Sequence, residues 1–169
     1  LGMTWYSSYA RNLPPGGLTP GSSYPKDGPF WSWATRIAPF IEQQNIYELF
    51  DMRGTAAAWP WWQFHPVTGA NLHEHTVPVF VCPSDSRGQL LSDPSMNNGR
   101  RAALTTYLGV SGRNQFQEAG GQDGMLYVNS SVRMRDVTDG LSNTLLVGER
   151  PPSNDLQYGW IWAGSGDHP

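Results

Sequence analysis

Residues 32–50 read SWATRIAPFIEQQNIYELF and carry the clearest periodic pattern in the chain. Apolar side chains recur in this stretch every three or four residues, as they do on one face of an α-helix. Ser32 is a suitable N-terminal cap. Pro39 falls inside the pattern, where a proline costs about 3 kcal/mol in a helix interior. The stretch therefore predicts two short helices, at about 32–38 and 40–50, with a break before Pro39.

The rest of the chain favours loops and short strands. Residues 1–11 have apolar spacing typical of the end of a helix, and the Pro/Gly-rich residues 12–29 predict a long surface loop. β-Branched and aromatic runs predict strands at 77–82, 105–110, 125–128, 132–135, 144–147 and 159–163. Helices followed by short antiparallel strands are typical of an α+β domain. We expect one domain over residues 1–169, with at least four of these strands in one antiparallel sheet.

Composition narrows the classes of function. Only 15% of the residues are charged, and 19 Gly and 14 Pro indicate a loop-rich globular protein. Eight Trp, seven Tyr and six Phe supply too much apolar surface for a disordered chain. The net charge of −3 removes the electrostatic basis for binding nucleic acid. A single cysteine, Cys82, excludes an intramolecular disulfide.

Three segments of the chain carry a resemblance to a known family. They are WATRIAPFIEQQ at 33–44, VPVFVCPSD at 77–85 and DVTDGLSNTLLVGER at 136–150. In this order and at this spacing they resemble the planctomycete-type family of secreted, pseudopilin-like proteins. Members of that family carry a prepilin-type N-terminal helix and a domain of unknown function. Residues 106–112 and 123–124 fit the same pattern.

The resemblance implies an extracytoplasmic protein, secreted or on the cell surface. Its implied architecture is pilin-like, with a long N-terminal helix packed on an antiparallel sheet. The implied partners are further copies or other pseudopilin-like subunits, and the implied membrane contact is only through the family's N-terminal helix. We expect the chain to be truncated at both ends: the family's prepilin-type membrane helix is absent from the sequence, and its C-terminal His-to-Asp-Gly signature would begin near His168. No established activity follows from the resemblance.

The segment 136–143 gathers short oxygen-bearing side chains around a glycine. Ca²⁺ binds six to eight oxygens of such groups, so the candidate calcium ligands are Asp136, Asp139, Ser142 and Asn143. The alternative is that these side chains cap a helical turn and close tight turns. We favour capping, and expect Asp139→Ala to lower stability. No other cofactor is indicated. The run His73-Glu74-His75 lacks the spacing of a helical zinc motif and predicts a solvated loop.

The tryptophans suggest a different class of function. Candidate ligand-binding residues are Trp59, Trp61, Trp62, Trp160 and Trp162. If these indoles are exposed, they could stack on the sugar rings of a polysaccharide; if they are buried, they fill the core or a subunit interface. Trp160 and Trp162 would point to the same side of a strand.

Two hypotheses of function follow. The first is a pseudopilin-like subunit or surface-binding protein without catalysis, which buried indoles would favour. The alternative is a carbohydrate-active protein, either a glycan-binding module or a small glycoside hydrolase. Glycoside hydrolysis uses two carboxylates, and Asp139 and Glu149 are the candidates. We expect no robust hydrolase turnover, because no nucleophile elbow, metal-ligand spacing or phosphate loop is present.

Overall fold

The computed structural model describes Met3, Tyr6, Ser7, Ala10 and residues 12–15, 31–50, 63–113 and 123–162. The four described residues of the N-terminal segment are helical, as the sequence predicts. None of the helices in the described ranges is long and apolar enough to cross a membrane.

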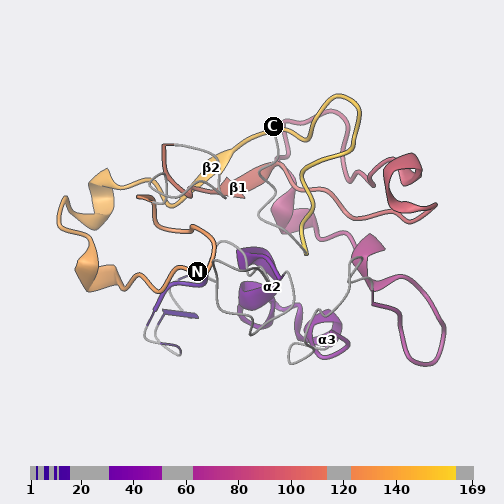
Figure 1. Ribbon diagram of the computed structural model, residues 1–169, viewed down its shortest axis with the longest axis horizontal. Coiled ribbons are helices and arrows are strands. Elements are labelled where there is room, and N and C mark those ends of the chain that lie inside the picture. The colour runs from indigo at the N-terminus through magenta and orange to yellow at the C-terminus, as the bar shows by residue number, and fades with distance from the viewer. Residues whose placement is uncertain are drawn as a thin grey trace.

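A short helical unit lies at the centre of the described chain (Figure 1). Helix α2 spans Trp33–Ile37, a 3-10 helix spans Ala38–Ile41, and α3 spans Gln44–Tyr47. Ser32 caps α2, because its hydroxyl oxygen accepts a hydrogen bond from the N–H of Thr35 at 3.4 Å. The geometry changes from α to 3-10 at Ala38, but the helical run continues through Pro39 to Ile41. It is interrupted at Glu42, whose φ is 62°, so the predicted break lies too early and α3 covers only part of the helix predicted at 40–50. Pro39 lies in the first turn of the 3-10 helix, where the missing N–H of a proline is tolerated.

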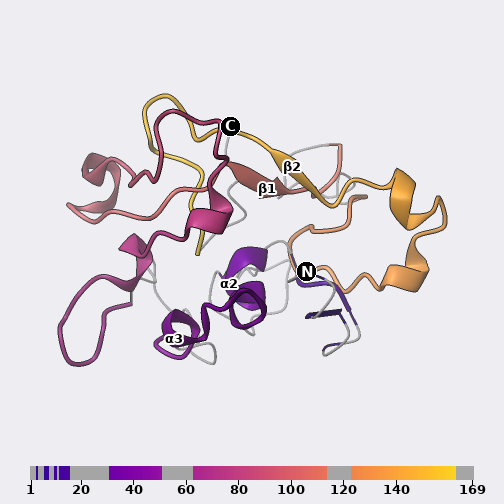
Figure 2. The ribbon, with the colours of Figure 1, turned by 180° about the vertical axis from the view of Figure 1, so that it is seen from behind.

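The sheet is small. Strand β1, Tyr107–Gly109, pairs antiparallel with β2, Val147–Glu149, so that Leu108 lies opposite Gly148. The pairing is extended at one end by the N–H of Arg150, which donates to the carbonyl of Thr106. In Figures 1 and 2 the two strands lie above α2 and α3 in both views. The protein is a loop-rich α+β fold.

The prediction of at least four paired strands is wrong for the residues that the structure describes. Residues 78–80 form a 3-10 helix, because Pro78 brings a fixed φ and no N–H for a ladder. Residues 134–136 form another 3-10 helix instead of a strand. Before it, Asn129 has a φ of 57°, a left-handed conformation that ends extended structure.

Two further predicted strands are shifted or reduced. The strand predicted at 144–147 begins only at Val147. The segment predicted at 159–163 makes one isolated bridge, between Trp160 and Leu104. Gly159 precedes that bridge with a φ of 108°, which a strand does not adopt. Only the strand predicted at 105–110 is found where the sequence places it.

Aromatic side chains dominate the core. The ring centroids of Trp31 and Phe50 lie 4.5 Å apart, and those of Phe50 and Trp162 lie 5.5 Å apart. Phe80 meets Trp162 edge-on at 6.3 Å and Trp33 edge-on at 5.8 Å. All five residues are buried. Aromatic pairs at such distances stabilise a core beyond the area that they bury, which compensates for the small amount of regular structure.

Hydrogen bonds join the start of α2 to the end of the described chain. The hydroxyl of Ser32 donates to the carbonyl of Ile161. The carbonyl of Trp162 accepts from the hydroxyl of Thr35 at 2.6 Å and from the N–H of Ser32 at 3.1 Å. The indole N–H of Trp162 donates to the carbonyl of His75 at 2.7 Å. We call these contacts the α2 clip; they fix the C-terminal segment against the helical unit.

Candidate functional site

The three sequence segments that carry the family resemblance meet in the structure. The N–H of Cys82, in the second segment, donates to the hydroxyl of Thr106 at 2.6 Å, next to β1. Strand β2 belongs to the third segment and pairs with β1. Trp33, in the first segment, packs against Phe80. These segments therefore build the core and the sheet.

An ion pair secures the loop after Cys82. Both carboxylate oxygens of Asp85 accept hydrogen bonds from the guanidinium of Arg87, at 3.0 and 2.8 Å. The hydrogen bonds from Arg87 lower the pKa of Asp85 to about 2. Arg87 also donates to the carbonyl of Pro152 at 3.4 Å. The pair thus connects the second segment to the chain that follows β2, and its role is structural.

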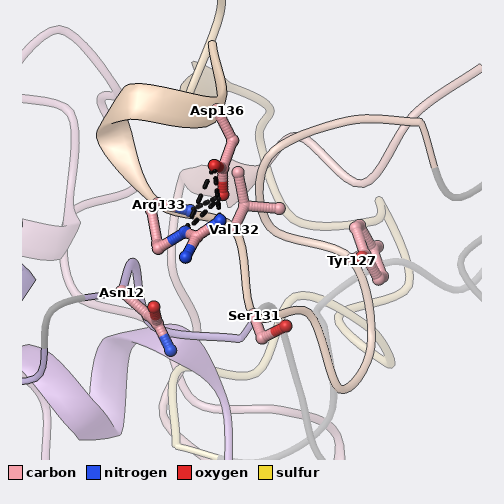
Figure 3. A pocket seen from close by; sticks show the side chains of 6 residues that line it. All are labelled: Asn12, Tyr127, Ser131, Val132, Arg133 and Asp136. Carbon is pink, nitrogen blue, oxygen red and sulfur yellow. Dashed lines mark hydrogen bonds and ion pairs between the residues drawn. The ribbon is translucent and has the colours of Figure 1, made fainter.

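An open polar pocket lies beside the end of the N-terminal helical segment (Figure 3). Its volume is about 480 Å³, and its lining residues are Asn12, Tyr127, Ser131, Val132, Arg133 and Asp136. The N–H of Leu13 donates to the carbonyl of Val132 at 2.8 Å. This bond brings Asn12 next to the loop that supplies the other five residues.

An ion pair forms one wall of this pocket. The carboxylate of Asp136 accepts from the backbone N–H of Arg133 at 3.0 Å, from its Nε at 2.9 Å and from its Nη2 at 2.9 Å. The side-chain hydrogen bonds, followed by the backbone one, lower the pKa of Asp136. The same pairing raises the pKa of Arg133. Both groups are therefore charged at neutral pH, and their charges compensate each other.

The pocket keeps further hydrogen-bonding capacity. An arginine has five N–H donors; the Nε–H and one Nη2–H of Arg133 are bonded to Asp136, and the other three have no partner among the described residues. Within the described residues, the side chains of Asn12, Tyr127 and Ser131 make no hydrogen bond. The arrangement therefore offers donors and acceptors together, without a net charge.

The calcium candidates lie in and next to this region, and all four are exposed. The carboxylate of Asp136 is engaged by Arg133, a cation of the chain itself. The side-chain amide of Asn143 donates to the carbonyl of Asp139 at 2.9 Å, and the Asp139 carboxylate lies 3.4 Å from the hydroxyl of Thr138. Among the described residues no three His, Cys, Asp or Glu side chains are grouped as a metal site. Of the two carboxylates Asp136 and Asp139, it is therefore Asp136 that caps a turn, by accepting from the backbone N–H of Arg133.

We predict that Asp136→Ala lowers the melting temperature at pH 7 more than Asp139→Ala does. Asp136 accepts hydrogen bonds from both the backbone and the side chain of Arg133, whereas Asp139 contacts one hydroxyl. Because the folded-state pKa of Asp136 is depressed, its stabilisation is present above the unfolded value of about 3.9 and is lost as the pH falls through the folded pKa. The difference between the variants should therefore fade in acid.

Thermal unfolding of both variants at pH 7 and in acid, with CaCl₂ or a chelator, checks this prediction. A melting temperature that rises with CaCl₂ only while Asp139 is present would instead support the calcium hypothesis. Equal effects of the two substitutions at pH 7 would contradict the capping role of Asp136.

The tryptophan candidates are divided among different places. Trp162 is only 1% exposed and belongs to the core. Trp160 is half-buried, and its indole N–H donates to the carbonyl of Gln157 at 2.9 Å. Trp59, Trp61 and Trp62 lie outside the described residues. Of the described candidates, Trp160 is therefore the one with an accessible surface.

The two carboxylates considered for hydrolysis are exposed and come from different elements. Asp139 lies in the turn before the 3-10 helix Leu141–Asn143, and Glu149 lies in β2 opposite Tyr107. Neither of them lines the polar pocket.

Sequence reasoning missed two features of the molecule. His73 was predicted in a solvated loop, but its side chain is buried, and its ring stacks on Trp31 at 5.8 Å with an interplanar angle of 10°. No pattern in the sequence marks this burial. The pocket was also missed, although the i,i+3 spacing of Arg133 and Asp136 is a detectable sign of their ion pair.

By its fold and its pocket, the chain is a loop-rich α+β protein with an open polar pocket. Residues 1–166 match the model of a family described as proteins of unknown function (DUF1559). The chain belongs to this family. No significant similarity to a curated protein or to a solved structure was found.

Proposed function

We propose that the chain is the extracytoplasmic part of a pseudopilin-like subunit of planctomycete type, which assembles with other subunits and does not catalyse a reaction. The observation that supports this most directly is the position of the N-terminal helical segment. Met3 and Tyr6 pack against the core, and the rings of Tyr6 and Phe40 meet edge-on at 5.8 Å. In the pilin-like architecture, the N-terminal helix packs against the rest of the domain in this way.

Exposed apolar side chains support an assembling surface. Leu141 and Leu145 are 58% and 74% exposed. Both belong to the stretch that follows the 3-10 helix Met134–Asp136, drawn in orange at the left edge of Figure 1. Burial of a leucine side chain in an interface contributes about 1.5–3 kcal/mol. A neighbouring subunit would supply such burial.

Three of the described indoles support the same proposal. Trp31, Trp33 and Trp162 are buried in the core, and buried indoles are the outcome that favours a structural subunit over a glycosidase groove.

Cell fractionation of the full-length gene product tests the proposal. With a C-terminal tag, the product should be found in the membrane fraction, exposed to protease added outside the cytoplasm. Co-expression with a prepilin peptidase should shorten it, because the resemblance implies a prepilin-type leader. An unprocessed product in the cytosolic fraction would overturn the proposal.

A second candidate function is glycan binding without catalysis. The observation that favours it is the polar pocket, whose two opposite charges are paired and whose side chains offer hydrogen bonds, with Trp160 as a further accessible aromatic side chain.

A further inference from the structure

We infer that the pocket formed by Asn12, Tyr127, Ser131, Val132, Arg133 and Asp136 binds one sugar residue of a neutral glycan. The inference rests on the second candidate function, and it assigns the binding to this pocket instead of to the tryptophans.

The charge balance of the pocket selects against ionic ligands. Among the described residues, Arg133 and Asp136 are its charged lining residues, and they are paired at 2.9 Å. A carboxylate or phosphate ligand would gain from the guanidinium but would be repelled by the neighbouring carboxylate. A neutral ligand meets no such opposition, so an uncharged polar molecule fits best.

The hydrogen-bonding groups match hydroxyls. Each sugar hydroxyl both donates and accepts, so a site for sugars needs both kinds of partner. The three remaining N–H groups of Arg133 donate, and the carboxylate of Asp136 has about four acceptor positions, of which Arg133 occupies some. Asn12 supplies a donor and an acceptor in one side chain, and the hydroxyls of Tyr127 and Ser131 serve as either.

The pocket also contains apolar surface. Val132 and Tyr127 line the pocket; in Figure 3 the side chain of Val132 lies beside the ion pair, and Tyr127 lies farther out on the other side of Val132. A pyranose has C–H groups as well as hydroxyls, and an aromatic ring presents a flat apolar surface together with a polar tip. This combination distinguishes a sugar from a small polar solute such as urea.

Size and rigidity agree with a single bound residue. A volume of about 480 Å³ lies within the range of roughly 300–1,000 Å³ found for small-molecule sites. The pocket is open, so a longer glycan can extend beyond it. The bonds between Arg133 and Asp136 hold the polar wall before any ligand arrives, which reduces the entropy lost on binding.

The test measures oligosaccharide binding to the full chain by saturation-transfer NMR and calorimetry. The neutral probes are cellotetraose, xylotetraose, mannotetraose and maltotetraose, and tri-galacturonic acid is the anionic probe. We expect at least one neutral probe to bind. Its affinity should persist at about 0.5 M NaCl, because a neutral ligand forms no ion pair with the protein that salt could screen.

A matched pair of variants locates the site. Ser131 is exposed in the pocket, so Ser131→Phe fills the pocket without removing a core contact; Ser86, also exposed, lies outside the lining. Ser131→Phe should weaken binding about tenfold or more, equivalent to at least about 1.4 kcal/mol. Ser86→Phe should leave the affinity unchanged. A second pair, Arg133→Gln and Arg135→Gln, should behave in the same way, with thermal unfolding as the check on folding.

Three results would overturn the inference. The first is that no neutral probe binds, which would also remove the glycan-binding function. The second is tighter binding of tri-galacturonic acid than of every neutral probe. The third is glycan binding that survives Ser131→Phe and is lost in Trp160→Ala; the glycan-binding function would then stand, with the tryptophan as its site.

Discussion

Trp162→Ala is expected to remove a large part of the free energy of unfolding. The indole is 1% exposed, contacts the rings of Phe50 and Phe80, and donates a hydrogen bond to the carbonyl of His75. Truncation of a buried tryptophan costs about 3–5 kcal/mol, against a typical total stability of about 5–15 kcal/mol. Urea unfolding followed by circular dichroism measures the loss.

The control for this prediction is Trp160→Ala, two residues earlier in the same segment. Trp160 is half-buried, so a smaller loss is expected because less area is uncovered. If the two substitutions lowered the stability equally, Trp162 would not be the core residue that the structure describes.

Gly124→Ala is expected to destabilise the protein strongly as well. A Cβ atom at Gly124 would lie 2.5 Å from the carbonyl oxygen of Val110 and 2.6 Å from the backbone nitrogen of Gly112. Both are backbone atoms, which cannot rotate away as a flexible side chain can. Overpacking typically costs about 1–3 kcal/mol, and we expect the upper part of that range.

Gly148→Ala is the matched control, because a Cβ placed there meets nothing within 4 Å beyond the glycine and its two chain neighbours. Urea midpoints of the two variants at one pH provide the comparison. A Gly124→Ala protein as stable as Gly148→Ala would show that the turn at 123–125 does not pack against 110–112 in this way.

The helical unit could be predicted from the sequence because its determinants are local. Ser32 as a cap and Pro39 at the start of the 3-10 helix act within a few residues of their own positions. The strand prediction failed for the opposite reason. β-Branched residues around Pro78 favour extended structure, but the backbone groups of this region bond to distant loops; for example, the N–H of Thr106 donates to the carbonyl of Phe80. Hydrogen-bond partners that are distant in the sequence leave no periodic pattern in it.

The pocket likewise combines a local determinant with a distant one. The pairing of Arg133 with Asp136 is local and is visible in the spacing of the two residues. The contribution of Asn12 depends on the bond between Leu13 and Val132, which joins segments far apart in the sequence. The chemistry of one wall was therefore predictable, and the existence of a pocket was not.

The α2 clip has a consequence for how the chain reaches its folded state. The hydroxyl of Thr35 and the carbonyl of Trp162 are separated by 127 positions in the sequence. While the polypeptide is being synthesised, the hydroxyls of Ser32 and Thr35 lack their carbonyl acceptors until Ile161 and Trp162 have been made. Contacts of such long sequence separation also slow folding, because the entropy of loop closure is lost before they form. The aromatic core around Phe50 and Phe80 therefore cannot close before Trp162 has been made.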